Sequence, residues 1–159
     1  MNIAVTKRLV FLVTLLVTVA ASAETIKRTA TRTQNDNNST TGVFKALTQG
    51  GATSVSFSTA AASTLIKLTY NAECGVLGTP QSWLAVTVLV DGVEANPKNN
   101  TDFAFCTAIS TTAYLWVGAV RQSTIKVAAG THTVQIRVDL VSGATHWWLG
   151  DTSLVVEAQ

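Results

Sequence analysis

The sequence has 159 residues, of which 47% are hydrophobic and 13% are charged, and its formal net charge is +2. A chain of this length is the ordinary size of one domain. So small a positive balance gives no basic footprint for nucleic acid or an anionic membrane, and we expect neither partner.

The first 23 residues have the order of features of a cleavable secretory signal peptide. Lys7 and Arg8 form a short positive region, an apolar run follows at residues 9–20, and residues 21–23 (Ala-Ser-Ala) suit signal peptidase. The apolar run is about a dozen residues long, whereas a membrane-spanning helix needs roughly 20. Cleavage would leave nine basic against nine acidic residues. The sequence therefore predicts a secreted or periplasmic protein without net charge.

The next segment, residues 24–41, is polar, and we expect it to form an N-terminal arm or an edge strand ahead of a β-sandwich domain at residues 42–159. Residues 35–41 read Asn-Asp-Asn-Asn-Ser-Thr-Thr. Calcium prefers side-chain oxygens of this kind, but the spacing and the bidentate Glu of a calcium loop are missing. We therefore expect an Asn-rich turn and no metal site.

Apolar residues recur at every second position over most of the remaining chain, which is typical of half-buried strands. The clearest case is residues 132–140, where Val134, Ile136 and Val138 point to one face and polar residues point to the other. Residues 82–90 are apolar on both faces, which predicts a central, fully covered strand. Further strands are expected at residues 43–47, 53–58, 64–70, 103–106, 112–120, 123–127, 146–149 and 153–157.

Glycine turns separate these strands, as at Asp91-Gly92, Gly130 and Gly143. About eight to ten short strands spaced in this way predict an all-β fold, an antiparallel β-sandwich. The spacing suits a jelly-roll-like arrangement better than an immunoglobulin fold.

Cys74 and Cys106 are the only cysteines of the chain. In an exported protein a single pair of cysteines predicts one disulfide. Two cysteines and two histidines are too few for a convincing zinc site, so we expect no zinc.

Five short stretches follow one another in a familiar order: Ala-Glu-Cys at 72–74, Val-Leu-Val-Asp-Gly-Val at 88–93, Phe-Ala-Phe-Cys at 103–106, Ala-Gly-Thr-His-Thr-Val at 129–134 and Ser-Leu-Val-Val-Glu at 153–157. With these stretches the chain resembles a group of small, uncharacterised secreted bacterial proteins with a jelly-roll-like sandwich. The patterns are also similar to those of complement C1q/tumour-necrosis-factor-like jelly rolls and of phage tail or adhesin modules. A common variant has two acidic residues before the last strand, whereas this chain has Gly150-Asp151. The resemblance thus implies a fold, gives no support for a calcium role, and names no activity.

No combination of residues predicts catalysis. The nucleophile elbow, the phosphate-binding loop and the His-Glu-x-x-His motif are absent from the sequence. His132 and His146 could meet an acidic partner such as Asp139 or Asp151. However, His132 begins a strand after a glycine turn, where its ring can hydrogen-bond the loop. We expect structural histidines, no enzyme and no cofactor.

Tryptophan is the feature of the sequence that points to binding. Trp147 and Trp148 are adjacent, so on a strand they point to opposite faces and at most one of them lies in the core. The other is a candidate platform for a sugar ring or a partner surface, with His146 beside it. Three other aromatic residues are expected in the core: Trp83, and Tyr114 with Trp116 on the strand predicted at 112–120.

Three functions remain open at this point. The leading hypothesis is a secreted, non-enzymatic β-sandwich that acts by binding or assembly as a structural or protein-interaction module, with an unknown protein or glycan partner and a possible homo-oligomer. The first alternative is a carbohydrate-binding module that uses Trp147 or Trp148. The second is a small outer-membrane β-barrel, although short strands and an internal cystine disfavour stable membrane insertion.

Overall fold

The computed structural model describes residues 27–98 and 103–159, so the predicted signal peptide lies outside the described residues. Over those two ranges the chain forms strands and no helix, and hence no helix that could cross a membrane. The strands are β1 (Lys27–Arg32), β2 (Asp36–Asn38), β3 (Val43–Phe44), β4 (Val55–Thr59), β5 (Thr64–Gly78), β6 (Trp83–Val90), β7 (Val93–Glu94), β8 (Ala104–Thr107), β9 (Val117–Val127), β10 (Gly130–Val141) and β11 (Ala144–Ala158).

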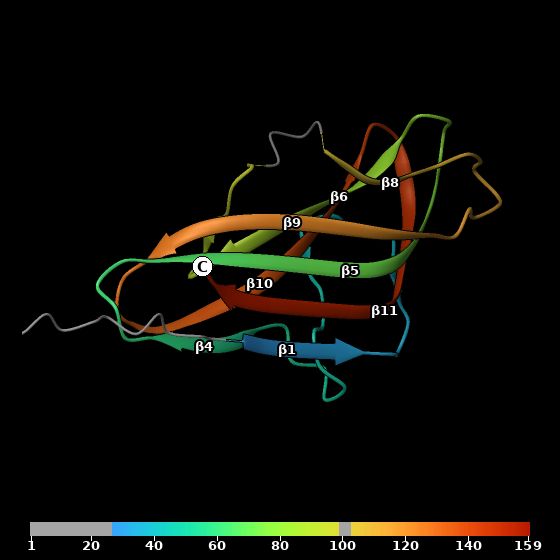
Figure 1. Ribbon diagram of the computed structural model, residues 1–159. Helices are drawn as coiled ribbons and strands as arrows, with labels where there is room; N and C mark the ends of the chain where they lie inside the picture. The colour runs from blue at the N-terminus through green and yellow to red at the C-terminus, as the bar shows by residue number, and fades with distance from the viewer. Residues whose placement is uncertain (1–26, 99–102) are drawn as a thin grey trace, which may run out of the picture.

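These strands form two antiparallel sheets that pack face to face (Figure 1). The first, called the β5 sheet, has the order β1-β11-β5-β9, and β2 continues β1 along the same edge of β11. The second, called the β6 sheet, has the order β3-β10-β6-β7, with β4 paired to β10 and β8 paired to β6. Taking β1, β4, β5, β6, β8, β9, β10 and β11 as eight successive strands gives sheets 1-8-3-6 and 2-7-4-5. That order is a jelly roll of two Greek keys, which confirms the predicted fold class.

The core lies between the two sheets and follows the predicted alternation. Val134, Ile136 and Val138 of β10 are fully buried, and β6 is buried at every position after Trp83. Each such aliphatic side chain contributes about 1.5–3 kcal/mol when it leaves water. The apolar side chains therefore gather between the sheets, whereas the outer-membrane alternative places them toward lipid.

Several strand boundaries differ from the sequence prediction. The segment expected as a strand at 112–120 is irregular up to residue 116, and β9 then runs without a break through the gap expected before 123. The two strands expected at 146–149 and 153–157 are one strand, β11, whose pairing with β5 shifts between Gly150 and Ser153. A bulge keeps a strand continuous but interrupts the alternation of its side chains. A prediction from periodicity alone therefore assigns two strands where there is one.

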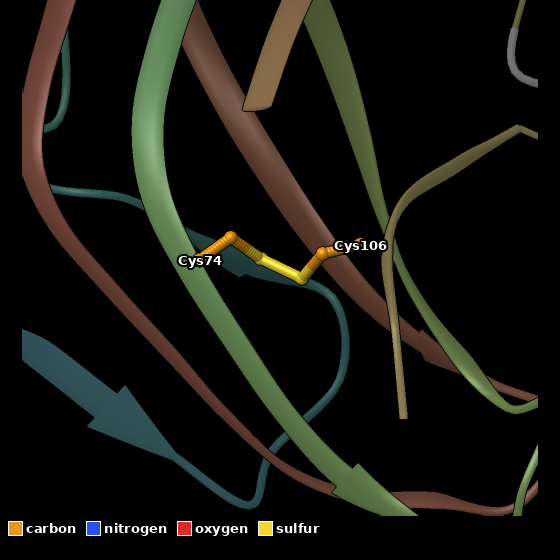
Figure 2. Close-up of a disulfide and its surroundings, with 2 residues drawn as sticks. All are labelled: Cys74 and Cys106. Atoms are coloured by element: carbon orange, nitrogen blue, oxygen red, sulfur yellow. A yellow bond between two sulfur atoms is a disulfide. The ribbon is translucent and has the colours of Figure 1, made fainter. Parts of the chain in front are cut away.

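The predicted disulfide is present, and it joins the two sheets through the core (Figure 2). Cys74 lies on β5 and Cys106 lies on β8, with their Cα atoms 6.3 Å apart. Both residues are buried, and the bond closes a loop with a sequence separation of 32. The cystine thus links the middle of one sheet to an edge strand of the other.

The turn between β6 and β7 is tied to β10 by a polar clamp. Asp91 and Gly92 have φ values of 50° and 78°, as the two-residue hairpin turn predicted for Asp-Gly requires. The carboxylate of Asp91 accepts the backbone N–H of Thr133 at 2.8 Å and contacts His132 Nδ1 at 2.7 Å. On the other side of the ring, His132 Nε2 lies 3.0 Å from the carbonyl oxygen of Ala128. Both ring nitrogens therefore face acceptors, which favours the imidazolium form.

The stability of the fold should depend on the protonation of this histidine. The hydrogen bond to Asp91 raises the pKa of His132 above its ordinary value of 6.5. A group whose pKa is raised by folding stabilises fully below its unfolded pKa, and this stabilisation is lost as pH rises through the folded pKa. We expect the free energy of unfolding from urea titrations to decline above pH 6.5, and H132N to flatten that decline. Equal slopes for wild type and H132N would contradict this assignment.

Candidate ligand-binding face

Three aromatic side chains form a cluster on the outer face of the β5 sheet. Trp148 projects outward from β11, while Trp116 and Tyr114 come from the segment that leads into β9. The ring of Trp116 stacks on Tyr114 with centroids 4.8 Å apart and meets Trp148 edge-on at 4.2 Å. Trp116 is nevertheless 45% exposed. The three rings, here called the aromatic cluster, therefore hold a tryptophan in place while much of its surface faces solvent.

Two glycines of the sheet let the rings lie close to the backbone. A Cβ on Gly75 would stand 2.5 Å from the ring of Trp116 and 3.0 Å from Tyr114. A Cβ on Gly150 would stand 2.5 Å from the ring of Trp148. Because real Cβ atoms do not approach so closely, both positions need glycine for this packing. Glycine inside a strand typically marks such a close approach.

The glycine at position 75 can be tested directly. We expect G75A to push Trp116 and Tyr114 off the sheet and to destabilise the fold by about 1–3 kcal/mol, as overpacking typically does. The tryptophan emission should shift to longer wavelength, and the near-ultraviolet circular dichroism of the packed rings should weaken.

The matched control is G118A on the neighbouring strand, where a new Cβ would meet no atom within 4 Å. We expect G118A to leave both spectra unchanged and not to lower the unfolding midpoint. If G75A behaved like G118A, the rings would not rest on Gly75 in solution.

The aromatic cluster corrects the sequence prediction for two residues. The sequence pattern predicts Tyr114 and Trp116 in the core on a strand at 112–120, but this part of the segment is not a strand and Trp116 is 45% exposed. Aromatic and small residues alternate in this segment because the rings pack side by side on the outside of the sheet, and not because they fill the core. Trp83, also expected in the core, is only partly buried at the start of β6.

A polar surface continues from the aromatic cluster along the same face. Two positions before Gly75 on β5 stands Glu73, which pairs with Gly118 on β9 and Gly150 on β11. We call these three residues the Glu73 row. The next row contains Asn71, whose amide donates to Ser153 Oγ at 3.1 Å. The face therefore places the apolar rings of the aromatic cluster next to the hydrogen-bonding side chains of Glu73 and Asn71.

The predicted candidates Trp147, Trp148 and His146 lie in different surroundings. Trp147 is 3% exposed, and its Nε1 donates to the carbonyl oxygen of Thr40 at 3.1 Å. It points away from the aromatic cluster and lines a separate cavity of about 400 Å³, together with residues 35–38 and 43–46. Trp148 belongs to the aromatic cluster, and His146 is exposed beside it on β11.

Beside this cavity, the one carboxylate of the Asn-rich segment, that of Asp36, forms ion pairs with two basic residues. Asp36 pairs with Arg32 at 2.9 Å and with the buried Lys45, and Arg32 also donates to the carbonyl oxygen of Thr48. Burial lowers the pKa of Lys45, although its contact with Asp36 opposes that change. Across residues 27–98 and 103–159, no three His, Cys, Asp or Glu side chains gather in a way that could hold a metal ion. The segment expected as a turn includes the short strand β2. The carboxylate of Asp36 holds this strand in place through its ion pairs.

The fold and the outer face together define a jelly-roll β-sandwich with an exposed aromatic cluster. No family model matches the chain, and no curated protein matches it. Among solved structures the chain is similar to one described as "EclA C-terminal domain; sugar-binding protein", with 10% identity, a TM-score of 0.37, and coverage of 86% of this chain and 80% of that one. It is also similar to a family 35 carbohydrate-binding module from Clostridium thermocellum, with 11% identity, a TM-score of 0.34, and coverage of 82% and 97%. Likeness at this level identifies no function, and the resemblance to secreted bacterial proteins stays a prediction.

Proposed function

We propose that this protein is an exported, non-catalytic carbohydrate-binding protein, and that its ligand lies on the outer face of the β5 sheet at the aromatic cluster. The observation that carries the proposal is the exposed ring of Trp116, held between Tyr114 and Trp148 beside the Glu73 row. A sugar ring has an apolar C–H face and a rim of hydroxyl groups. An aromatic surface next to polar side chains offers a partner to each of these.

Export is the second part of the proposal. The Cys74–Cys106 disulfide supports it, because such bonds persist in oxidising compartments outside the cytosol. The predicted signal peptide at residues 1–23 supports it independently. We therefore place the protein in the periplasm or outside the cell.

A protein-interaction surface is the second candidate, because apolar side chains are exposed near the aromatic cluster. Leu115 precedes Trp116, and Val120 lies on the outer face of β9, three residues after Val117 where the strand begins. Exposed apolar residues that gather on one face are typical of contact surfaces between proteins. On this alternative the same face would bind a partner protein or a second copy of the chain.

A glycan array followed by tryptophan-fluorescence titration separates the two candidates. Carbohydrate binding should quench or shift the emission of Trp116 with saturation, while the protein remains the same size in solution. No response to any glycan, together with a defined oligomer by light scattering, would reject the carbohydrate proposal in favour of the second candidate.

A further inference from the structure

The side chain of Glu73 lies between two glycines on the outer face of the sheet. Its partners across the sheet are glycines on both sides, so no neighbouring side chain covers it from β9 or β11. The space above Gly118 is open, because a Cβ there would meet no atom within 4 Å. On the other side the ring of Trp148 and the amide oxygen of Asn35 lie over Gly150. The carboxylate is therefore bordered by open space on one side, and by the aromatic cluster and Asn35 on the other.

Among the described residues Glu73 has no partner, which sets it apart from most of the described acidic residues. The structure describes seven acidic residues, and within the described ranges Glu73 and the exposed Asp151 have no hydrogen bond or ion pair. Glu73 is the more enclosed of these two. A partly buried carboxylate without a donor is costly, so a ligand that brings donors would compensate it. The other five have interactions: Asp36, Asp91, Glu94, Asp139 and Glu157.

The charges on this face favour one class of ligand. Lys67, the outward-facing cation of β5, is three side-chain positions from Glu73, or about 20 Å along the strand. It stands opposite Glu157 on β11 at that far end. Near the Glu73 row, Asp151 follows Gly150 and adds a second negative charge. An anionic ligand on the aromatic cluster would therefore meet negative charge at close range.

We infer that Glu73 is the specificity-determining residue of the proposed site, and that it selects neutral saccharides over anionic ones; this rests on the proposed function. Its two carboxylate oxygens accept hydrogen bonds from two adjacent hydroxyl groups of a sugar whose apolar face lies on Trp116. Hydrogen bonds to an ionised acceptor are roughly twice as strong as neutral ones. A uronic acid or a sulfated sugar places a like charge at the same position and is rejected.

The experiment compares neutral oligosaccharides with anionic counterparts that differ at one carbon. The probes are gluco-, galacto- and manno-configured oligosaccharides and the uronic acids made from them by oxidation at C6. Titrations are run at about pH 8, where the carboxylic acid of a uronate probe is fully ionised. The variants are E73Q, which removes the charge and keeps the shape, and E157Q, which makes the same change of charge at the far end of the same face.

We expect the wild type to bind a neutral probe at least tenfold more tightly than its uronate. E73Q should lower the affinity for the neutral probe about fivefold and reduce the preference for the neutral probe over its uronate to less than threefold. E157Q should keep the wild-type preference. The unfolding midpoint of E73Q should not fall, because the carboxylate of Glu73 has no partner among the described residues that the substitution would remove.

Neutral and anionic probes that bind equally to the wild type, or a preference that E73Q leaves intact, would overturn the role of Glu73 while the proposed function stands. A wild type that binds none of the probes in either form would overturn both.

Discussion

Replacing Trp116 with alanine is expected to weaken carbohydrate binding by roughly 10- to 100-fold, while the fold remains intact. Burying a large apolar side chain against a ligand contributes about 1.5–3 kcal/mol, which corresponds to this range of affinity. Trp116 is 45% exposed and packs on the outside of the sheet, so its loss leaves the core between the sheets untouched. Isothermal titration with the best glycan from the array gives the affinity, and urea unfolding gives the stability.

The matched control is F44A, which removes another exposed aromatic side chain. Phe44 is 44% exposed on β3, at the edge of the other sheet, and it lines the cavity beside Trp147. We expect F44A to bind the glycan like the wild type. If F44A lost binding and W116A kept it, the ligand would belong to the Trp147 cavity and the outer face would not be the site.

The fold was predictable because its strands alternate strictly where one face is buried. Val134, Ile136 and Val138 define the core face of β10 without any structural information, and the apolar run of β6 marks a central strand. The order of the strands was not predictable in the same way. It depends on which edges pair over long sequence separations, as when β1 pairs with β11. Local sequence patterns carry no direct record of such pairings.

The candidate site was only half predictable. The adjacency of Trp147 and Trp148 required opposite orientations, and the structure buries the first and directs the second outward. Tyr114 and Trp116 were assigned to the core because an aromatic residue at every second position also describes a buried strand face. Periodicity reports that side chains share a side, but it does not report whether that side faces the partner sheet or solvent.

The sequence contains a further signal for the site, in its strand glycines. Gly75, Gly118 and Gly150 all lie inside strands, where glycine costs stability unless something approaches the backbone closely. Two of them accommodate the rings, and Gly118 leaves open space beside Glu73. Of these, only Gly75 lies near Glu73 in the sequence, so it alone could have indicated this part of β5, whereas the pairing of Glu73 with Gly118 and Gly150 depends on the strand order.

Removing the disulfide is expected to lower the free energy of unfolding by about 3–4 kcal/mol. The bond closes a loop with a sequence separation of 32 and thereby restricts the unfolded chain. Because small domains are stable by only about 5–15 kcal/mol, this loss is a large part of the total. The variant C74A/C106A avoids placing polar side chains at two buried positions. Urea unfolding of the variant, and of the wild type with and without reductant, measures the difference.

The same substitution also tests what holds the aromatic cluster in position. Cys74 immediately precedes Gly75, on which Trp116 rests, and Cys106 lies on β8, ahead of the segment that carries Tyr114 and Trp116. We expect folded C74A/C106A to keep its glycan affinity within about threefold, because the rings are held by their packing on Gly75 and Trp148. A large loss of affinity in the folded variant would mean that the cystine positions the site. A loss of stability below about 1 kcal/mol would mean that the bond does not restrict the unfolded chain as the loop-closure model requires.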